Sequence, residues 1–260
     1  MGVEKTEAIV IGSWPLGESD LIVAFYTRAH GKLRGVAKAA RRPRSRFCGS
    51  LELFTHGSLV FFEKETTDLV RINSFDVLRP YEALREDLAR IGCGAWMVEC
   101  LSRLTPDRDP SPALFVLLLD GFRHLAEGSD PARALPLYAL RLLDLLGHRP
   151  QLARCLGCRR APVAPARFEP AMGGILCRRC ADPGRGIVLR GPTLTALQRL
   201  QQLSWADDQR LRLTTAQRDE AQAVVQEYVT YLVGQPSRSL RFLACVEPPP
   251  AVGAAPLDVP

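Results

Sequence analysis

Four cysteines, arranged as two pairs, have the spacing in this 260-residue sequence that points most clearly to a chemical role. The segments CLGC, residues 155–158, and CRRC, residues 177–180, are separated by eighteen residues. Two thiolates on one tight turn hold a metal ion from one side, and a second such turn completes a tetrahedron of sulfur ligands. The spacing therefore predicts one structural zinc ion, held by Cys155, Cys158, Cys177 and Cys180.

Two other chemistries remain open for these cysteines, namely a redox dithiol at either pair and an iron–sulfur cluster. Four thiolates leave no open coordination position, so a zinc site here would brace the chain and would not catalyse a reaction. Four arginines beside the thiols favour the thiolate form that a metal requires; they are Arg159, Arg160, Arg178 and Arg179. The other four cysteines are not arranged in C-x2-C pairs and are interpreted as small buried apolar side chains. They are Cys48, Cys93, Cys100 and Cys245.

A basic stretch, GKLRGVAKAARRPRSRF at residues 31–47, is the second feature with chemical content, because it contains seven Lys or Arg and no acid. Residues 21–51 carry a net charge of +8 and residues 149–190 a net charge of +7. The whole chain carries +6, so the remaining residues must carry −9. Positive charge gathered in two segments is the pattern expected for a protein that binds a polyanion, and above all a nucleic acid.

Residues 6–80 contain the elements that must position this basic stretch. Segments rich in β-branched and aromatic residues predict five strands separated by turn residues. The predicted strands cover residues 6–14, 20–27, 32–39, 51–63 and 69–78. Five closely spaced strands favour a small barrel of the OB type, with an SH3-like barrel or a small sandwich as the competing architectures.

The same strands predict how the cations are presented. Lys32, Arg34 and Lys38 alternate along one strand and would share a face, while arginines on the loop that follows would clamp phosphates. One or two aromatic rings on the open face would stack on bases. The candidate rings are Phe25, Tyr26, Phe47, Phe54, Phe61 and Phe62, and the loop arginines are Arg41, Arg42, Arg44 and Arg46.

From residue 81 the apolar residues recur with helical spacing. Helices are predicted over residues 81–104, 111–128, 131–147, 192–203 and 214–234, with Thr214 and Gln217 forming a capping box at the start of the last. The helices before and after residues 149–190 are expected to pack as one unit. The fold class is therefore α+β and multidomain. The expected order is an OB-fold nucleic-acid-binding domain (1–80), a first helical part (81–148), an irregular zinc-binding insert (149–190), a second helical part (191–245) and a disordered Pro-rich tail (246–260).

The sequence also argues against several classes of protein. The longest apolar run, ALFVLLL at 113–119, is far short of a membrane span, and the first residues do not read as a secretory signal, so a cytoplasmic protein is expected. No P-loop, GxGxxG, GxSxG or HExxH pattern is present, and we predict that the protein is not an enzyme. A metal-dependent nuclease would need several acids converging on the barrel, and nothing in the sequence indicates them.

The N-terminal motifs resemble those of the RecO family of bacterial recombination mediators. The resemblance is carried by GE-x-D-x-I/L at Gly17 to Ile22, by T-x-x-x-G at Thr27 to Gly31, and by V-A-K-x-x-R-R-x-x-S-R at Val36 to Arg46. It extends along the chain to about residue 245, and the four-cysteine insert between helices is similar to that of many family members.

The resemblance implies a non-enzymatic protein that binds single- and double-stranded DNA and anneals complementary strands. It also implies partnership with RecR and with the C-terminal tail of the single-strand-binding protein, so that RecA is loaded on coated DNA, and association with the nucleoid during repair. An RNA-binding or translation-associated OB protein with a structural zinc ribbon is the alternative. By motif match, the predicted DNA contacts are Lys32, Arg34, Lys38, Arg41, Arg42, Arg44 and Arg46.

Overall fold

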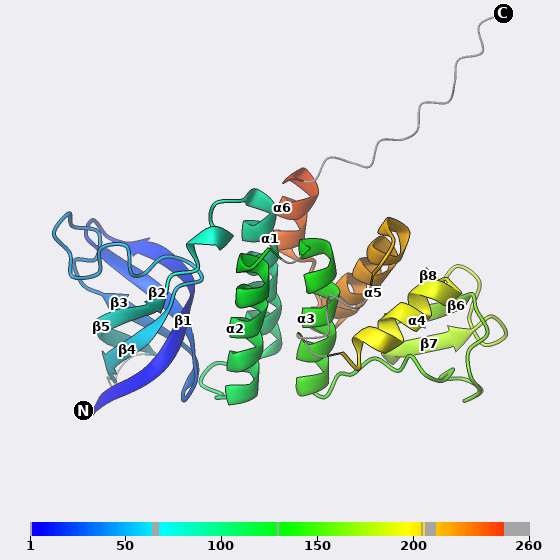
Figure 1. Ribbon diagram of the computed structural model, residues 1–260. Helices are drawn as coiled ribbons and strands as arrows, with labels where there is room; N and C mark the ends of the chain where they lie inside the picture. The colour runs from blue at the N-terminus through cyan, green and yellow to red at the C-terminus, as the bar shows by residue number, and fades with distance from the viewer. Residues whose placement is uncertain (1, 64–67, 129, 204, 206–211, 247–260) are drawn as a thin grey trace, which may run out of the picture.

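The computed structural model describes residues 2–63, 68–128, 130–203, 205 and 212–246. The molecule is elongated, with a β-barrel at one end, a layer of helices in the middle and a small sheet at the other end (Figure 1). The predicted tail, 246–260, lies outside the described residues except for Val246, which ends the last helix.

The five N-terminal strands close into a barrel in the order β1-β2-β3-β5-β4. Strands β1 and β4 pair antiparallel and complete the closure, while β3 and β5 pair parallel. The predicted five-stranded barrel is confirmed, although the first half of the predicted strand 51–63 forms turns instead. The strands are β1 (Val3–Leu16), β2 (Asp20–Thr27), β3 (Gly31–Ala37), β4 (His56–Phe62) and β5 (Leu69–Arg79).

The barrel buries a core of its own because inward and outward residues alternate along each strand. In β3 every second residue, from Gly31 to Ala37, is buried, while Lys32 and Arg34 lie on the outer face. The inward side chains include Val10, Val23, Phe25, Leu33, Leu59, Phe61, Val70 and Ile72.

In the helical region, the described residues form a short 3-10 helix and six α-helices. The predicted helix over 81–104 is interrupted, because the Asp87 carboxylate accepts the N–H of Arg90 and starts a new helix after the 3-10 turn. The Thr214–Gln217 capping box is present as predicted. The elements are η1 (Glu82–Leu84), α1 (Leu88–Leu104), α2 (Pro112–Ala126), α3 (Pro131–Leu145), α4 (Gly191–Leu200), α5 (Thr215–Val233) and α6 (Arg238–Val246).

One continuous apolar core joins the helices that precede and follow residues 149–190, which confirms that they pack as one unit. Trp96 of α1 and Tyr138 of α3 are fully buried in it, and Tyr138 donates its hydroxyl hydrogen to the carbonyl of Met97 at 3.0 Å. The same core includes Tyr26 from the outside of the barrel and Phe168 from the small sheet. Both ends of the molecule are therefore packed against the helical layer. Among the described helices, none is long and apolar enough to cross a membrane.

The segment expected to be irregular contains a small three-stranded sheet. Its strands are β6 (Ala166–Glu169), β7 (Gly174–Cys177) and β8 (Ile187–Leu189), in the order β7-β6-β8, with the 3-10 helix η2 (Pro170–Met172) between the first two. Strands of three or four residues are too short to show a hydrophobic alternation, which explains why the sequence did not reveal them. The sheet is held to the helices by Phe168, whose ring lies 5.4 Å from that of Tyr228 in α5.

Candidate metal centre and nucleic-acid interface

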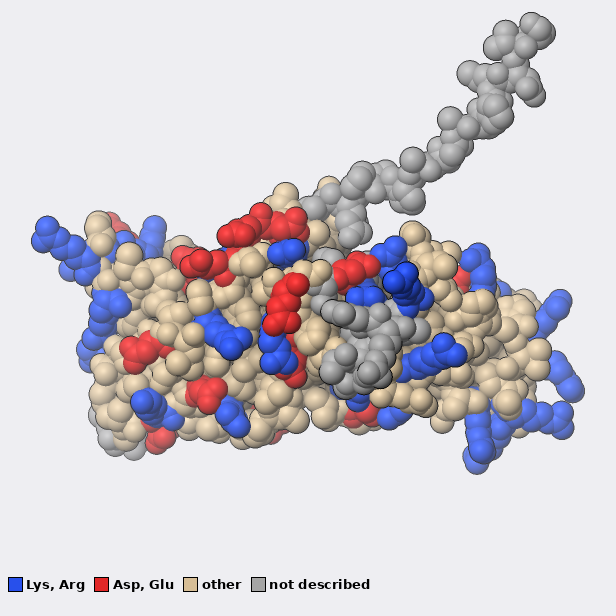
Figure 2. Space-filling model, in the orientation of Figure 1, with Lys and Arg blue, Asp and Glu red and all other residues tan. Residues whose placement is uncertain are grey.

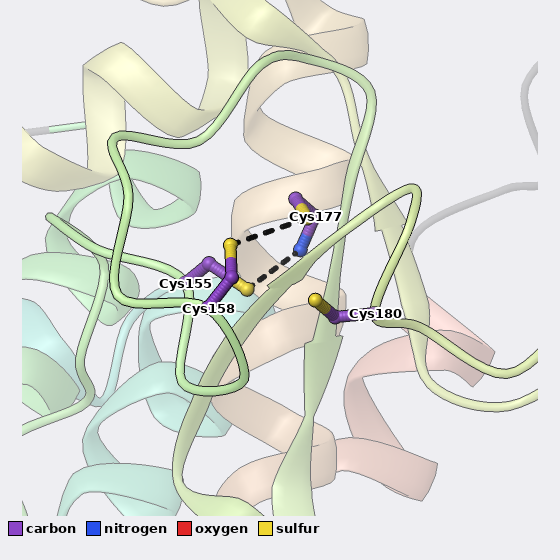
Figure 3. Close-up of side chains that lie close together, drawn as sticks. All are labelled: Cys155, Cys158, Cys177 and Cys180. Carbon is purple, nitrogen blue, oxygen red and sulfur yellow. Dashed lines mark hydrogen bonds between the residues drawn. The ribbon is translucent and has the colours of Figure 1, made fainter.

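The four paired cysteines come together at one end of the small sheet. Cys155 and Cys158 lie on the turn before β6, Cys177 ends β7, and Cys180 lies on the turn that follows (Figure 3). Their four Sγ atoms all lie within 4.8 Å of one another, and Cys158 Sγ and Cys177 Sγ are 3.8 Å apart. Sulfurs bound tetrahedrally at about 2.3 Å from one ion are separated by about 3.8 Å. The sulfur spacing therefore fits a four-thiolate metal site.

Two matching turns produce this arrangement. The carbonyl of Cys155 accepts the N–H of Arg159 at 2.8 Å, and the carbonyl of Cys177 accepts the N–H of Ala181 at 3.0 Å. Gly157 permits their close approach, since a Cβ atom at this position would lie 2.9 Å from Cys180 Cβ. The first turn is fixed to the sheet by the N–H of Leu156, which donates to the carbonyl of Ile175 at 2.9 Å.

The acidities of the thiols also indicate a site for a cation. Burial raises the pKa of Cys155, but backbone N–H groups of Cys158, Cys177 and Gly157 outweigh it and lower the pKa to about 6. The pKa of Cys180 is raised to about 12, first by its contact with the Cys177 sulfur and then by burial. Ionising one sulfur thus opposes ionising another close to it, and a bound cation would remove that conflict. The cluster can hold a metal ion, with all four positions filled by protein.

The other cysteines divide into two groups. Cys93 and Cys100 of α1 are buried, as interpreted from the sequence. The same interpretation is wrong for Cys48 and Cys245, which are exposed. Cys48 lies on the basic loop, residues 38–49 between β3 and β4, and Cys245 lies in the last turn of α6. Both are exposed because no other part of the described structure covers these two segments.

The basic loop, residues 38–49, is anchored to the turn between β1 and β2. Asp20 Oδ1 accepts the N–H of Ala39 at 2.8 Å, and Asp20 Oδ2 lies 2.7 Å from Lys38 Nζ. Lys38 first, and the Ala39 N–H second, hold the pKa of Asp20 below its ordinary value. Arg41 donates through Nη1 to the carbonyls of Gly17 and Glu18, at 3.3 Å each. The G-E-x-D motif therefore supports the base of the basic loop.

The far end of the basic loop is fixed by burial. Phe47 is inserted into the barrel core, and the guanidinium carbon of Arg46 lies 4.9 Å from the centroid of its ring. The loop is thus held at both ends and presents its arginines outward. All four arginines are exposed, and none of them forms an ion pair with a carboxylate among the described residues. Arg41 donates to the backbone carbonyls named above, which leaves Arg42, Arg44 and Arg46 without such a partner.

The cations of β3 lie differently. Lys32 and Arg34 share the outer face of the barrel, as the alternation predicts. The same prediction is wrong for Lys38, because β3 ends at Ala37 and Lys38 lies in the basic loop, where it pairs with Asp20. Both contact Asp107, which follows α1: Lys32 Nζ lies 3.1 Å from Oδ1, and Arg34 Nη2 lies 3.6 Å from Oδ2. Lys32 also donates to the carbonyl of Ser102, and its side chain is only 13% exposed. Lys32 therefore links the barrel to the helices, whereas the side chain of Arg34 is 57% exposed.

The aromatic residues named from the sequence do not form a stacking face. Five of the six are buried, and Phe62 is partly buried. The exposed ring on this side of the barrel is that of Trp14, in β1, which the sequence analysis did not single out. Asp20 and Asp107 were missed as well. Strand alternation counted from the buried Val10 would place Trp14 inside the barrel, but the irregular pairing of β1 and β2 between Val10 and Gly12 shifts the register and turns Trp14 outward.

Arginines form a second basic zone at the opposite end of the molecule. Arg159, Arg160, Arg178 and Arg179, which flank the cysteines, are all exposed. In the space-filling view, Lys and Arg project at both ends of the molecule, and most of the Asp and Glu on this face lie over the helices and the adjoining half of the barrel (Figure 2). The two basic zones are therefore at opposite ends of the molecule.

The sequence matches two family models that together cover most of the chain. Residues 1–81 match the model described as recombination protein O, N terminal, and residues 85–241 match recombination protein O, C terminal. The chain is 31% identical to the DNA repair protein RecO of Symbiobacterium thermophilum over 245 residues, which cover 93% of this chain and 95% of that protein.

Two further relatives show similar agreement. The chain is 35% identical to the DNA repair protein RecO of Roseiflexus sp. (strain RS-1), covering 93% of this chain and 85% of the relative. It is also 35% identical to that of Anaeromyxobacter sp. (strain K), covering 94% and 97%. Since both halves match in order and over nearly their full length, the chain belongs to the recombination protein O (RecO) family.

Proposed function

We propose that this protein is a non-enzymatic, DNA-binding recombination mediator that acts in DNA repair in the bacterial cytoplasm and nucleoid. It binds single- and double-stranded DNA, anneals complementary strands and, with RecR, helps to load RecA onto DNA coated by the single-strand-binding protein. The observation that carries the DNA-binding part is the rigidly anchored basic loop, whose exposed Arg42, Arg44 and Arg46 have no described acidic partner. Membership of the family supports the repair role.

The predicted DNA contacts differ in how available their charged groups are to a phosphate. Arg42, Arg44 and Arg46 have no described acidic partner and are the principal contacts, whereas Arg41 also donates to the carbonyls of Gly17 and Glu18. Arg34 forms an ion pair with Asp107, and Lys38 forms one with Asp20. A phosphate that binds either cation would have to compete with that carboxylate. Lys32 is held between barrel and helices and is the least available of the predicted set. If six phosphates of a single strand are contacted, log K falls with log salt with a slope near −4 (about 0.7 for each phosphate).

The two basic zones support the proposal that the protein anneals complementary strands. Two DNA strands repel each other, and a protein that neutralises one strand at the barrel and another at the small sheet reduces this repulsion. The arginines beside the cysteines are the proposed second phosphate surface.

The four cysteines are proposed to hold one structural zinc ion. When bound, the ion supplies a fixed cross-link between the two turns and offsets the charge of the thiolates. We also propose a domain organisation. Residues 1–80 form the DNA-binding barrel, residues 81–148 and 191–245 form one helical domain, and residues 149–190 are an insert in that domain, braced by the metal. RecR and the tail of the single-strand-binding protein are proposed as partners from family membership, and the tail is assigned to the helical domain.

Fluorescence anisotropy with labelled single strands tests the DNA-binding proposal. Replacing Arg41, Arg42, Arg44 and Arg46 by Ala should weaken binding to all sequences alike and flatten the salt slope. The matched variant with four Lys at the same positions keeps the charge and should retain most of the affinity. Wild-type protein that does not bind DNA in dilute buffer would overturn the proposal. Tighter binding to matched RNA would favour the RNA-binding alternative, and products formed from end-labelled DNA with Mg²⁺ or Mn²⁺ would indicate a nuclease.

A further inference from the structure

Trp14 presents its indole ring on the outer face of the barrel. Its residue surface is 52% exposed, whereas Trp96 of the same chain is fully buried. The ring lies across Gly12, since a Cβ atom at Gly12 would be only 2.7 Å from Trp14 Cη2. Because Gly12 has no side chain, the indole ring can pack directly against the backbone of the strand. A large ring that is held in place and still exposed is a surface on which another ring can stack.

The neighbouring strands continue this surface. Trp14 of β1 pairs with Ile22 of β2, and Ile22 pairs with Val36 of β3, so the three side chains form one row across the sheet. Ile22 and Val36 are partly buried and apolar. In the adjacent row Gly12 pairs with Ala24, and Ala24 pairs with Arg34. An aromatic and aliphatic strip is thus bordered by the partly exposed guanidinium of Arg34.

A hollow of about 300 Å³ opens beside this strip. Its walls include Trp14, Ile11, Ala24, Arg34 and Asp107. This volume is at the lower end of the range for small-molecule sites, about 300–1,000 Å³, and suits a single ring system better than a larger ligand. Lys32 and Arg34 also line the hollow, but both form ion pairs with Asp107. A neutral base that enters it meets the apolar walls and the ring of Trp14.

The basic loop lies next to the same end of the strip. The anchoring of Arg41 to the carbonyls of Gly17 and Glu18 places the loop beside the turn that follows β1, only a few residues beyond Trp14. A strand whose phosphates lie along the loop arginines can therefore turn its bases towards the sheet. Cationic residues along the backbone and rings under the bases are the combination by which OB folds hold single strands without reading sequence.

We infer that Trp14, seated on Gly12, is the stacking platform for one unpaired nucleobase of single-stranded DNA, which enters the hollow beside Arg34. This inference rests on the proposed function and adds the residue that distinguishes a single strand from a duplex. Bases in a duplex are already stacked on both sides, so the indole contributes to binding only where bases are free.

Three ligands of equal length test this assignment on the full chain: an oligo-dT strand, an abasic strand with the same phosphates, and a duplex. Trp14→Ala should weaken binding of oligo-dT by roughly 5- to 160-fold, the range expected for loss of one stacked base. It should leave binding of the abasic strand and the duplex, and the salt slope, unchanged. Trp14→Phe should retain most of the affinity. Leu78→Ala, which removes an exposed apolar side chain from β5, is the matched control and should bind as the wild type does.

Fluorescence provides a second readout. Of the three tryptophans, Trp96 is buried and Trp205 lies partly buried against the helical core, so quenching by oligo-dT should come from Trp14 and disappear in Trp14→Phe. Unchanged oligo-dT affinity in a folded Trp14→Ala variant would overturn the inference. An equal loss for the abasic strand would overturn it too, because the effect would then act through the backbone. If only the loop-arginine variant loses binding, the stacking assignment fails and the proposed function stands; if the wild type binds no strand, both fail.

Discussion

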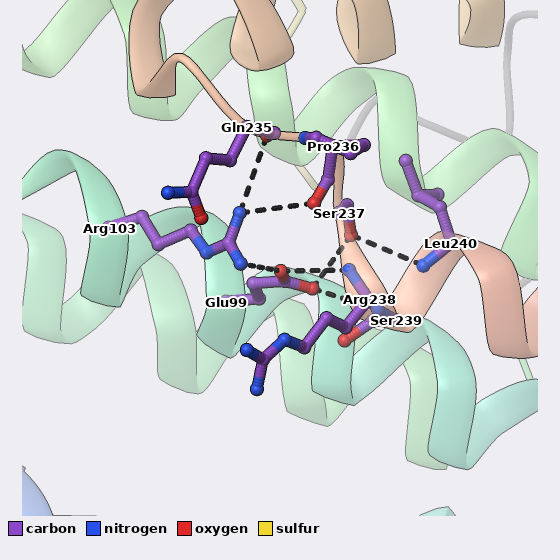
Figure 4. A network of polar contacts seen from close by, with 8 residues as sticks. All are labelled: Glu99, Arg103, Gln235, Pro236, Ser237, Arg238, Ser239 and Leu240. Atoms are coloured by element: carbon purple, nitrogen blue, oxygen red, sulfur yellow. Dashed lines mark hydrogen bonds and ion pairs between the residues drawn. The ribbon is translucent and has the colours of Figure 1, made fainter.

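The Glu99 carboxylate, on helix α1, accepts the backbone N–H of Ser239 at 2.9 Å, so that a side chain of one helix caps the first turn of another (Figure 4). The same carboxylate accepts the N–H of Arg238 at 3.0 Å and the hydroxyl of Ser237 at 2.7 Å. Helix α6 is short, and a helix of this length is not stable alone. Its position therefore depends on Glu99 and on the packing of Leu243 against Gly92 of α1.

Replacing Glu99 by Ala should lower the free energy of unfolding by about 1–3 kcal/mol, because it leaves several donors at the start of α6 without a partner. Glu99→Gln, which keeps an oxygen acceptor, should lose less. Denaturant unfolding monitored by circular dichroism measures both. Equal stability of Glu99→Ala and the wild type would show that the packing of α6 suffices without the cap.

The same residue predicts a pH dependence. Burial raises the pKa of Glu99, but hydrogen bonds from Ser237, Ser239 and Arg238 outweigh it, and the pKa lies below the ordinary value of 4.5. A lowered pKa in the folded state means that Glu99 contributes stability above pH 4.5, and that this contribution is lost as the pH falls through the folded-state pKa. Unfolding free energies measured between pH 3 and 6 should fall less steeply with acid in Glu99→Gln. Parallel curves for the two proteins would contradict this assignment.

Metal removal should affect one end of the molecule only. Purified protein is expected to contain one zinc ion per chain by elemental analysis, and a chelator should increase hydrogen exchange in residues 149–190 while leaving the barrel strands protected. Cys158→Ser should reduce the bound zinc. Cys48→Ser is the matched control, because Cys48 is also exposed but lies on the basic loop, far from the cluster in the chain. Zinc loss in Cys48→Ser, or full zinc content in Cys158→Ser, would exclude the proposed ligand set.

Two glycines with similar backbone angles should differ in their tolerance of a methyl group. Gly31 has φ 63° and lies so close to the backbone of Asp109 that a Cβ atom would be 2.3 Å from its carbonyl oxygen. Gly17 has φ 60° but meets nothing within 4 Å. Gly17→Ala should therefore cost only the left-handed backbone strain, about 1–2 kcal/mol. Gly31→Ala should cost roughly 1–3 kcal/mol more through overpacking. Thermal and denaturant unfolding of the pair provide the test, and equal losses would mean that the loop bearing Asp109 moves aside freely.

Asp107 is expected to restrain DNA binding. Its carboxylate forms ion pairs with Lys32 and Arg34. Asp107→Asn removes the negative charge and should therefore free Arg34 to bind a phosphate. Affinity for single strands should rise, and the salt slope should steepen by about 0.7, the value for one added phosphate contact on a single strand. Asp76→Asn removes an exposed acid elsewhere on the barrel and controls for the change in net charge. An equal gain in both variants would assign the effect to net charge instead of to the release of Arg34.

Periodic segments explain where prediction from the sequence succeeded. The runs of β-branched and aromatic residues over β2 and β5, and the helical spacing over α2, α3 and α5, are long enough to be recognised, and these elements are present. The sheet of β6, β7 and β8 and the helix α6 are too short or too irregular for that. Their stability comes from contacts with residues distant in the sequence, such as Phe168 with Tyr228.

The amino-acid sequence by itself determined the grouping of the four paired cysteines, the two basic segments and the order of barrel and helices, because spacing, charge and hydrophobic period are local properties. Only the tertiary structure decided which cations remain available. Lys32 is largely buried, because it donates to the carbonyl of Ser102 in α1 and pairs with Asp107. Phe47, in contrast, fixes the loop that exposes Arg42 and Arg44. It also decided that Trp14 is the exposed ring, since exposure depends on which residues from other strands and helices cover a side chain, and a linear sequence does not contain that information.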